Sequence, residues 1–207
     1  MPESIKRSFE EIAKMKTPGP SPSFSIFQLI RALELIGEKE VGRGKLAEHL
    51  SVGEGAVRTI IGRFKAAGLV STAKAGCSLT KSGLGLLSRY RKVFRAKADF
   101  GKTELVSSNN NLAILVKNCG GKVKSGMEQR DAAIKIGAET AVTIVVRNKH
   151  LVIPSVSNDL FEDFPRAAHQ IMRLLSPVEN DAIVIAGADD SGVAAYGALA
   201  AAWTLVD

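Results

Sequence analysis

The segment from Arg43 to Gly83 constrains the fold of this chain most, because two helix-forming patterns meet there across a very short turn. In residues 54–67, four apolar residues share one face at the i, i+3, i+4, i+7 spacing of a core-facing stripe, namely Val57, Ile60, Ile61 and Phe64. A shorter amphipathic pattern covers residues 43–50, and Ser51-Val52-Gly53 lies between the two. We therefore expect two short helices joined by a tight turn.

The residues after this helix pair predict a small β-hairpin. Its strands are expected at about residues 69–73 and 77–79, with Lys74-Ala75-Gly76 at the tip. Three stretches, AEHLSVGEGAVRTIIGRF, AAGLV and LTKSG, resemble the winged helix-turn-helix of transcriptional regulators over roughly the N-terminal half. The resemblance implies a winged-helix domain that binds DNA, and it leaves the target gene open.

The second helix and its neighbours offer candidate DNA contacts. Arg58, Thr59, Gly62 and Arg63 lie off the apolar stripe, so this face is free to enter a groove. The two arginines could reach guanine edges or hold phosphates, and Gly62 would permit close approach of a DNA backbone or close helix packing. The full candidate set is Arg58, Thr59, Gly62, Arg63, Lys74, Lys45 and Lys81. A solvated helix face, or a winged helix that binds protein, is the alternative.

The distribution of charge favours DNA. Residues 1–97 contain 18 Lys and Arg against 8 Asp and Glu, a net charge of +10. Residues 98–207 contain 10 against 13, a net charge of −3. A basic half joined to a slightly acidic half is expected where one half meets nucleic acid.

A chain of 207 residues is long enough for two modest domains, which we place at residues 1–98 and 99–207. The order of parts and the GEGAVRT turn are also similar to an uncharacterised archaeal family in which a winged helix precedes a domain of unknown function. The N-terminus is charged, no apolar run is long enough to span a membrane, and the cysteines are few, so we expect a cytoplasmic protein. Cys77 and Cys119 indicate no disulfide framework, although a bond between them stays possible.

The remaining N-terminal patterns predict three further helices. Residues 1–16 carry Ile5, Phe9 and Ile12 on one side, and a proline-rich linker follows at residues 17–23. We expect Ser23 to cap a helix that runs to about residue 37, and Gly53 or Ser51 to cap the helix at residues 54–67. A last helix is expected from Ser82 to about Ala98, with a strongly basic far end that could contact DNA or solvent, or build a dimer interface.

The C-terminal half alternates between the two periodicities, which predicts a small α+β (mixed α/β) domain. We expect strands at about 112–116, 141–146, 151–153 and 182–186, and helices at about 127–137, 163–175 and 191–206. Asn148-Lys149 suits a hairpin turn between two of the strands. The last helix carries no charge and many alanines, so it should be buried on most sides, under the sheet or against a second subunit.

One turn in this half is a candidate ligand site. Asp189, Asp190 and Ser191 follow a buried strand and precede a helix, so they could hold a cation or a polar ligand. A structural role in capping the helix is the stronger alternative. Arg130 beside Asp131 could grip a carboxylate or form an internal ion pair.

No residue spacing indicates a metal site, a cofactor or a catalytic signature, so we do not expect an enzyme. The expected function is a regulator that binds double-stranded DNA as a homodimer, with a C-terminal domain that senses a small-molecule effector or dimerises. An enzyme recruited by the winged helix is the rival.

Overall fold

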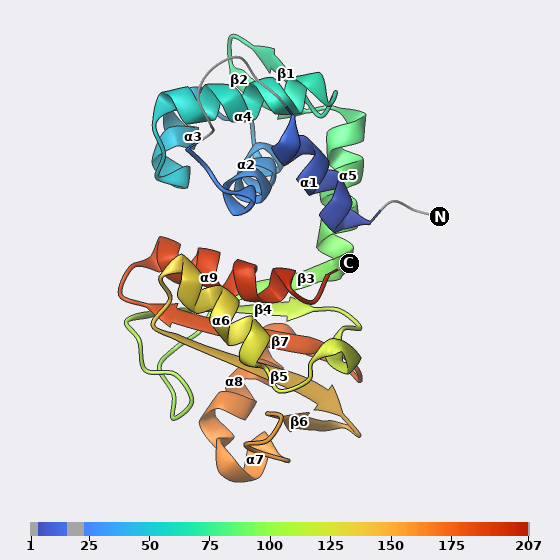
Figure 1. The fold of residues 1–207 in the computed structure, drawn as a ribbon, viewed down its shortest axis with the longest axis vertical. Coiled ribbons are helices and arrows are strands. Elements are labelled where there is room, and N and C mark those ends of the chain that lie inside the picture. Colours follow the sequence, from blue (N-terminus) through green and yellow to red (C-terminus); the bar gives the residue numbers. More distant parts are fainter. Residues whose placement is uncertain (1–3, 16–22, 207) are drawn as a thin grey trace. The chain divides into compact units, whose positions relative to one another are not determined.

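The computed structural model describes residues 4–15 and 23–206, and the chain divides into two compact units (Figure 1). The first ends at Tyr90 and the second is Arg91–Val206, so each is described by itself. The boundary expected after residue 98 falls inside the first strand of the second unit, β3 (Phe94–Asp99). None of the described helices is long and apolar enough to cross a membrane.

The first unit is helical, with one two-stranded sheet. Its apolar stripe is buried as expected: Val57, Ile60 and Phe64 are inaccessible to solvent. The antiparallel strands of the hairpin pair from Val70 with Leu79 to Ala73 with Gly76. The elements of this unit are α1 (Ile5–Lys14), α2 (Ile26–Glu38), α3 (Arg43–Leu50), α4 (Glu54–Ala66), β1 (Val70–Ala73), β2 (Gly76–Leu79) and α5 (Lys81–Val93).

One helix cap differs from the prediction, and at another the structure selects Gly53 from the two expected residues. The N-cap of α2 is Ser25 rather than Ser23, and Ser25 forms a reciprocal capping box with Gln28. Ser51 does not cap α4, because it ends α3 in a left-handed conformation (φ 52°), while Gly53 is the N-cap of α4 without a side-chain bond. Serine was the better capping residue in isolation, but the tight turn needs a left-handed residue at that position. Most of the expected linker at residues 17–23 lies outside the described residues.

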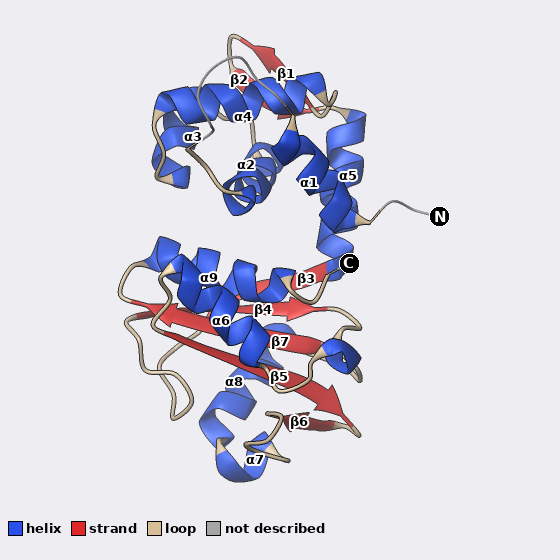
Figure 2. Cartoon of the chain, in the orientation of Figure 1, coloured by secondary structure: helices blue, strands red, loops and turns tan. Residues whose placement is uncertain are grey.

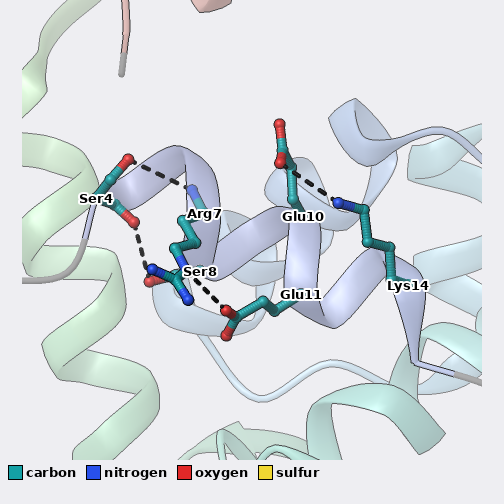
Figure 3. A network of polar contacts seen from close by, with 6 residues as sticks. All are labelled: Ser4, Arg7, Ser8, Glu10, Glu11 and Lys14. Atoms are coloured by element: carbon teal, nitrogen blue, oxygen red, sulfur yellow. Dashed lines mark hydrogen bonds and ion pairs between the residues drawn. The ribbon is translucent and has the colours of Figure 1, made fainter.

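Helix α1 packs through one face and is charged on the other. Its predicted apolar residues Ile5, Phe9 and Ile12 are buried. On the outer face, Arg7 pairs with Glu11 at 3.0 Å and Lys14 pairs with Glu10 at 3.7 Å, both at the i, i+4 spacing (Figure 3). The Ser4 hydroxyl caps the helix by accepting a hydrogen bond from the Arg7 amide, which starts the helix at Ile5.

The second unit is built on a five-stranded sheet in the order β3-β4-β7-β5-β6, in which all neighbours are antiparallel. Helices α6 and α9 pack against one face, and α8 lies on the other (Figure 2). The mixed α+β class is therefore confirmed. The remaining elements are β4 (Asn110–Val116), a 3-10 turn (Gly120–Lys122), α6 (Met127–Ile136), β5 (Thr140–Arg147), β6 (His150–Val152), α7 (Leu160–Asp163), α8 (Pro165–Leu175), β7 (Ala182–Ala188) and α9 (Ser191–Trp203).

The start of the second unit was predicted wrongly. The helix expected to run to Ala98 ends at Val93, and the next residues form β3 instead. The helix expected at residues 163–175 is confirmed as α8, which begins two residues later than expected because Pro165 occupies its first position. The short helix α7 before it was not expected. The hairpin turn is confirmed, since Asn148 and Lys149 both have positive φ values (52° and 65°).

Helix α9 is buried on most sides, as its uncharged sequence predicted. It packs against β4, β7 and α6. An added Cβ on Gly197 would lie 2.8 Å from the Ala138 Cβ, so the glycine permits this close approach. The Trp203 ring stacks on Phe94 with centroids 5.9 Å apart. Cys77 and Cys119 are both buried free thiols.

Candidate nucleic-acid interface

An open hollow of about 580 Å³ lies in the first unit, between the start of α3, the outer face of α4 and the hairpin β1–β2. Among the described residues, the charged side chains that line it are all cations, namely Arg43, Arg58, Lys65 and Lys74. All four are exposed, and no ion pair joins any of them to an acidic residue in the described part of the chain. The hollow is therefore an electropositive concave surface.

Helix α4 presents its cations because its opposite face is fixed in the core. Arg58, Gly62 and Lys65 follow one another at the i, i+4, i+7 spacing, so they share one exposed face. A Cβ on Gly62 would meet no atom within 4 Å. Close helix packing, one of the two expected reasons for this glycine, is therefore not present within the described residues. The glycine leaves a flat site between two cations.

The hairpin is held in place by Val41, which forms an antiparallel bridge with Cys77. The Cys77 amide donates to the Val41 carbonyl at 2.9 Å, and the Val41 amide donates back at 3.3 Å. Gly76 makes this approach possible, because its φ is +145° and an added Cβ would lie 2.8 Å from the Val41 carbonyl carbon. The bridge fixes the position of the turn that carries Lys74.

Arg63 is not part of this surface, which corrects the prediction. Its side chain is 4% exposed, and its Nη1 donates to the Ala13 carbonyl at the end of α1 at 2.6 Å. The guanidinium also lies 5.1 Å from the Phe24 ring centroid, a cation–π contact. Burial lowers the pKa of Arg63 from its ordinary value. Arg63 joins α1 to α4, and this role could not be predicted from spacing because its partners are distant along the chain.

The other predicted contacts surround the hollow without lining it. Lys45 is exposed on α3, and Lys81 is exposed at the first position of α5. Thr59 is half-buried, and its hydroxyl donates to the Gly55 carbonyl at 3.1 Å. Of the seven candidates, the hollow brings together Arg58, Gly62 and Lys74. The prediction missed Arg43 and Lys65, although Lys65 could have been found from its i+7 spacing to Arg58.

Cys77, one of the residues that line the hollow, has a thiol that is not activated as a nucleophile. Burial raises the pKa of the Cys77 thiol, while the nearby cations Arg43 and Lys65 act in the opposite direction. Because the net shift is upward, the thiol stays protonated at neutral pH, and the reactive thiolate is disfavoured. Cys77 therefore has a packing role beneath the hairpin.

In the second unit, the predicted turn at Asp189 and Asp190 has a structural role. Asp190 is the N-cap of α9, and its Oδ1 accepts a hydrogen bond from the Val193 amide at 2.9 Å. The Asp189 carboxylate accepts from the Asn109 side-chain amide at 2.7 Å, and its backbone amide donates to Glu139 at 3.1 Å. Ser191 is exposed at the first position of α9. The capping interpretation of this turn is therefore the one that the contacts support.

Arg130, the other predicted ligand residue, lines a separate hollow. Neither Asp189 nor Asp190 is among the described residues that line it. Within residues 4–15 and 23–206, no three His, Cys, Asp or Glu side chains gather closely enough to hold a metal ion. His150 forms a hydrogen-bonded pair with Asp159 at 2.7 Å.

These features define a class of protein: a basic unit with a helix–turn–helix pair and a hairpin, followed by an α+β unit with a five-stranded antiparallel sheet. Residues 29–85 match a family model described as "PH0730-like, N-terminal domain". Residues 107–205 match a model described as "Domain of unknown function (DUF4443)". No curated protein sequence matches the chain.

Among solved structures, the chain is similar to hypothetical protein PH0730 from Pyrococcus horikoshii OT3, with a TM-score of 0.72 and 25% sequence identity. The match covers 88% of this chain and 93% of that protein. The expected similarity to an uncharacterised archaeal protein is confirmed, and the C-terminal half of this chain matches a domain of unknown function, as expected.

Proposed function

We propose that the first unit is a winged helix-turn-helix that binds double-stranded DNA, and that the protein regulates transcription. The observation that carries the proposal is the hollow between α4 and the hairpin, because its four charged lining residues are all cations. Phosphate neutralisation by Lys and Arg supplies most non-specific affinity for DNA. A concave surface of uniform sign is suited to that task.

In this proposal, α4 is the recognition helix. Its 13 residues span about 20 Å, enough to lie in a major groove about 12 Å wide. Arg58 is near the N-terminal end of the helix, where recognition helices contact base edges, and is the residue best placed to reach a guanine. The flat site at Gly62 lets the helix backbone come close to the DNA.

The other three cations hold the phosphate backbone. Lys65 lies two turns after Arg58 on the same face, Arg43 is at the start of α3, and Lys74 is at the turn of the hairpin. The hairpin would act as the wing, with Lys74 against the backbone beside the groove. Such contacts set the register and orientation of the helix without reading the sequence.

We further propose that the protein acts as a homodimer, in which two recognition helices contact half-sites one helical turn of DNA apart, or about 34 Å. The second unit would supply the dimer contact or sense an effector that changes the spacing of the two helices. The similarity in fold to the archaeal protein is compatible with this function but does not name it.

The test compares single variants by fluorescence anisotropy with labelled duplex DNA. Arg58→Ala should cost about 1–3 kcal/mol on the preferred sequence and relax specificity at one base pair. Lys74→Ala should weaken binding to all sequences alike and flatten the salt dependence. Lys135→Ala, an exposed cation of the second unit, is the matched control and should bind as the parent does.

Equal affinity of all three variants and the parent would contradict this docking geometry. Absent DNA binding at low salt would instead favour the rival in which the winged helix contacts a protein.

A further inference from the structure

Strand β5 has an edge that is only half covered. Strand β6 pairs with Val145–Arg147, so residues 140–144 have no strand on that side in the described part of the chain (Figure 2). Continuing the same register would place Pro154 opposite Thr143, and proline has no amide to donate. The chain turns away there through an isolated bridge between Ile153 and Ser157.

The hairpin geometry shows which backbone groups face the open edge. Arg147 and His150 flank a two-residue turn, so odd-numbered residues of β5 direct their N–H and C=O groups toward β6. In agreement, the Val146 amide points the other way and donates to the Asp181 carbonyl at 3.0 Å. Ala141 and Thr143 therefore present their backbone groups to the uncovered part of the edge.

These backbone groups lack partners within residues 4–15 and 23–206. Ala141 is half-buried, and Thr143 is only 4% exposed. A buried backbone donor or acceptor without a partner costs about 1–3 kcal/mol, so such groups are normally bonded to something. The open edge is consequently a place where an added amide would gain hydrogen bonds.

The edge opens into a hollow of about 430 Å³. Its volume falls within the range of small-ligand pockets, roughly 300–1,000 Å³. Large apolar side chains surround it, and two of them are unusually exposed for their type: Met127 at 54% and Val156 at 68%. The apolar side chains that line it, apart from those of β5 itself, are Leu105, Met127, Ile153, Pro154 and Val156.

Arg130 is the only charged residue among the described residues that line this hollow. Its guanidinium bonds to the Asp131 carboxylate at 3.0 Å, but both side chains are about half exposed. An exposed ion pair of this kind contributes little, so the guanidinium can exchange this partner for a carboxylate of a ligand. The hollow thus combines apolar walls, unpaired backbone amides and one cation.

We propose that this hollow binds a short peptide, or a peptide-like amide, with a free carboxylate. The ligand would lie along residues 140–144 as an added strand and exchange hydrogen bonds with Ala141 and Thr143. Its carboxylate would bind Arg130, and an apolar side chain would fill the space beside Met127 and Val156. This site goes beyond the DNA interface and does not depend on it.

The probe is a library of N-acetylated tripeptides with free C-terminal carboxylates, screened against the full-length chain by amide NMR. Binding peptides should shift the Ala141 and Thr143 amide signals and slow their hydrogen exchange. The same peptides with amidated C-termini should bind at least about tenfold more weakly, which corresponds to about 1.4 kcal/mol.

Two variants test the two recognition elements. Arg130→Gln should abolish the preference for a free carboxylate, and Lys135→Gln on the same helix is the control that should retain it. Ala141→Pro removes an amide that faces the open edge and leaves the pairing with β7 intact, so it should abolish binding. Preserved amide spectra would establish that each variant is folded.

Failure of the whole library to bind would overturn the proposal, and so would binding that survives both Arg130→Gln and Ala141→Pro. Concentration-dependent protection of Ala141 and Thr143 without any peptide would also overturn it, by showing that a second copy of the chain covers the edge.

Discussion

At the scale of single residues, Gly62 leaves a flat site on the exposed face of α4. This glycine is exposed between Arg58 and Lys65, and a Cβ there would meet no atom within 4 Å. Glycine in a helix interior costs about 1 kcal/mol relative to alanine. The described residues gain no packing from this glycine, and its place between two cations of the hollow is what makes close approach to DNA testable here.

Gly62→Ala should therefore separate stability from DNA binding. We expect it to stabilise the fold by about 0.5–1 kcal/mol while it weakens DNA binding, because a methyl group would stand between the helix and the groove. Gly85→Ala is the matched control, since Gly85 is also an exposed helix residue with no atom within 4 Å of its Cβ position. Thermal melts and anisotropy would measure the two effects. Unchanged DNA affinity in Gly62→Ala would refute close approach at this site.

Replacing Arg63 should lower the stability of the fold, whereas replacing Gly62 should raise it. Replacing Arg63 with alanine removes the hydrogen bond to Ala13 and the contact with Phe24, so we expect a loss of about 1–3 kcal/mol of stability. Arg58→Ala, which removes an exposed side chain of the same helix, should leave the melting temperature nearly unchanged. Denaturant titration of both variants checks this. Equal stability of the two variants would contradict a structural role for Arg63.

At the scale of elements, the sequence predicts best those helices whose structure is decided by burial of their own apolar face. Helices with a full apolar stripe, such as α4, were predicted to within a residue because burial of one face decides their structure. Strand β3 was missed because its sequence, FRAKAD, continues the preceding helical pattern, and only pairing with β4 makes it a strand. In the candidate site, the exposed cations of α4 and the hairpin could be read from spacing. The buried position of Arg63 could not, since it depends on contacts with α1 and Phe24.

The start of α8 gives an acid-dependent prediction for the second unit. The Glu104 carboxylate accepts hydrogen bonds from the Arg166 amide at 2.8 Å and the Ala167 amide at 3.3 Å, and pairs with the Arg166 guanidinium at 3.0 Å. Burial alone would raise the pKa of Glu104, but these bonds, with one from its own amide, hold the pKa below its usual range. A depressed native pKa stabilises the fold above the unfolded pKa of about 4.3 and loses that effect as pH falls through the native value.

Glu104→Gln should consequently lower the melting temperature at neutral pH, and the difference from the parent should shrink as the pH falls below about 4. Glu162→Gln, which changes another exposed carboxylate of the same unit, provides the comparison. A difference that is independent of pH would show that the Glu104 charge is not what stabilises the start of α8.

At the scale of the whole molecule, the net charge changes sign close to the boundary between the two structural units. Residues 1–97 carry a net charge of +10 and contain the cationic hollow, whereas residues 98–207 carry −3. The second unit has its own hydrophobic core and its own five-stranded sheet. Non-specific attraction to DNA should therefore reside in the first unit and weaken steeply with salt.

The most direct test of the central claim is fluorescence anisotropy with two labelled duplexes, the DNA upstream of the protein's own gene and a scrambled version, across a salt series. We predict tight binding that falls with rising salt and favours the upstream DNA, and an Arg58→Ala variant that loses this preference. Absence of binding to either duplex at low salt would contradict the assignment of the α4–hairpin hollow as a DNA interface.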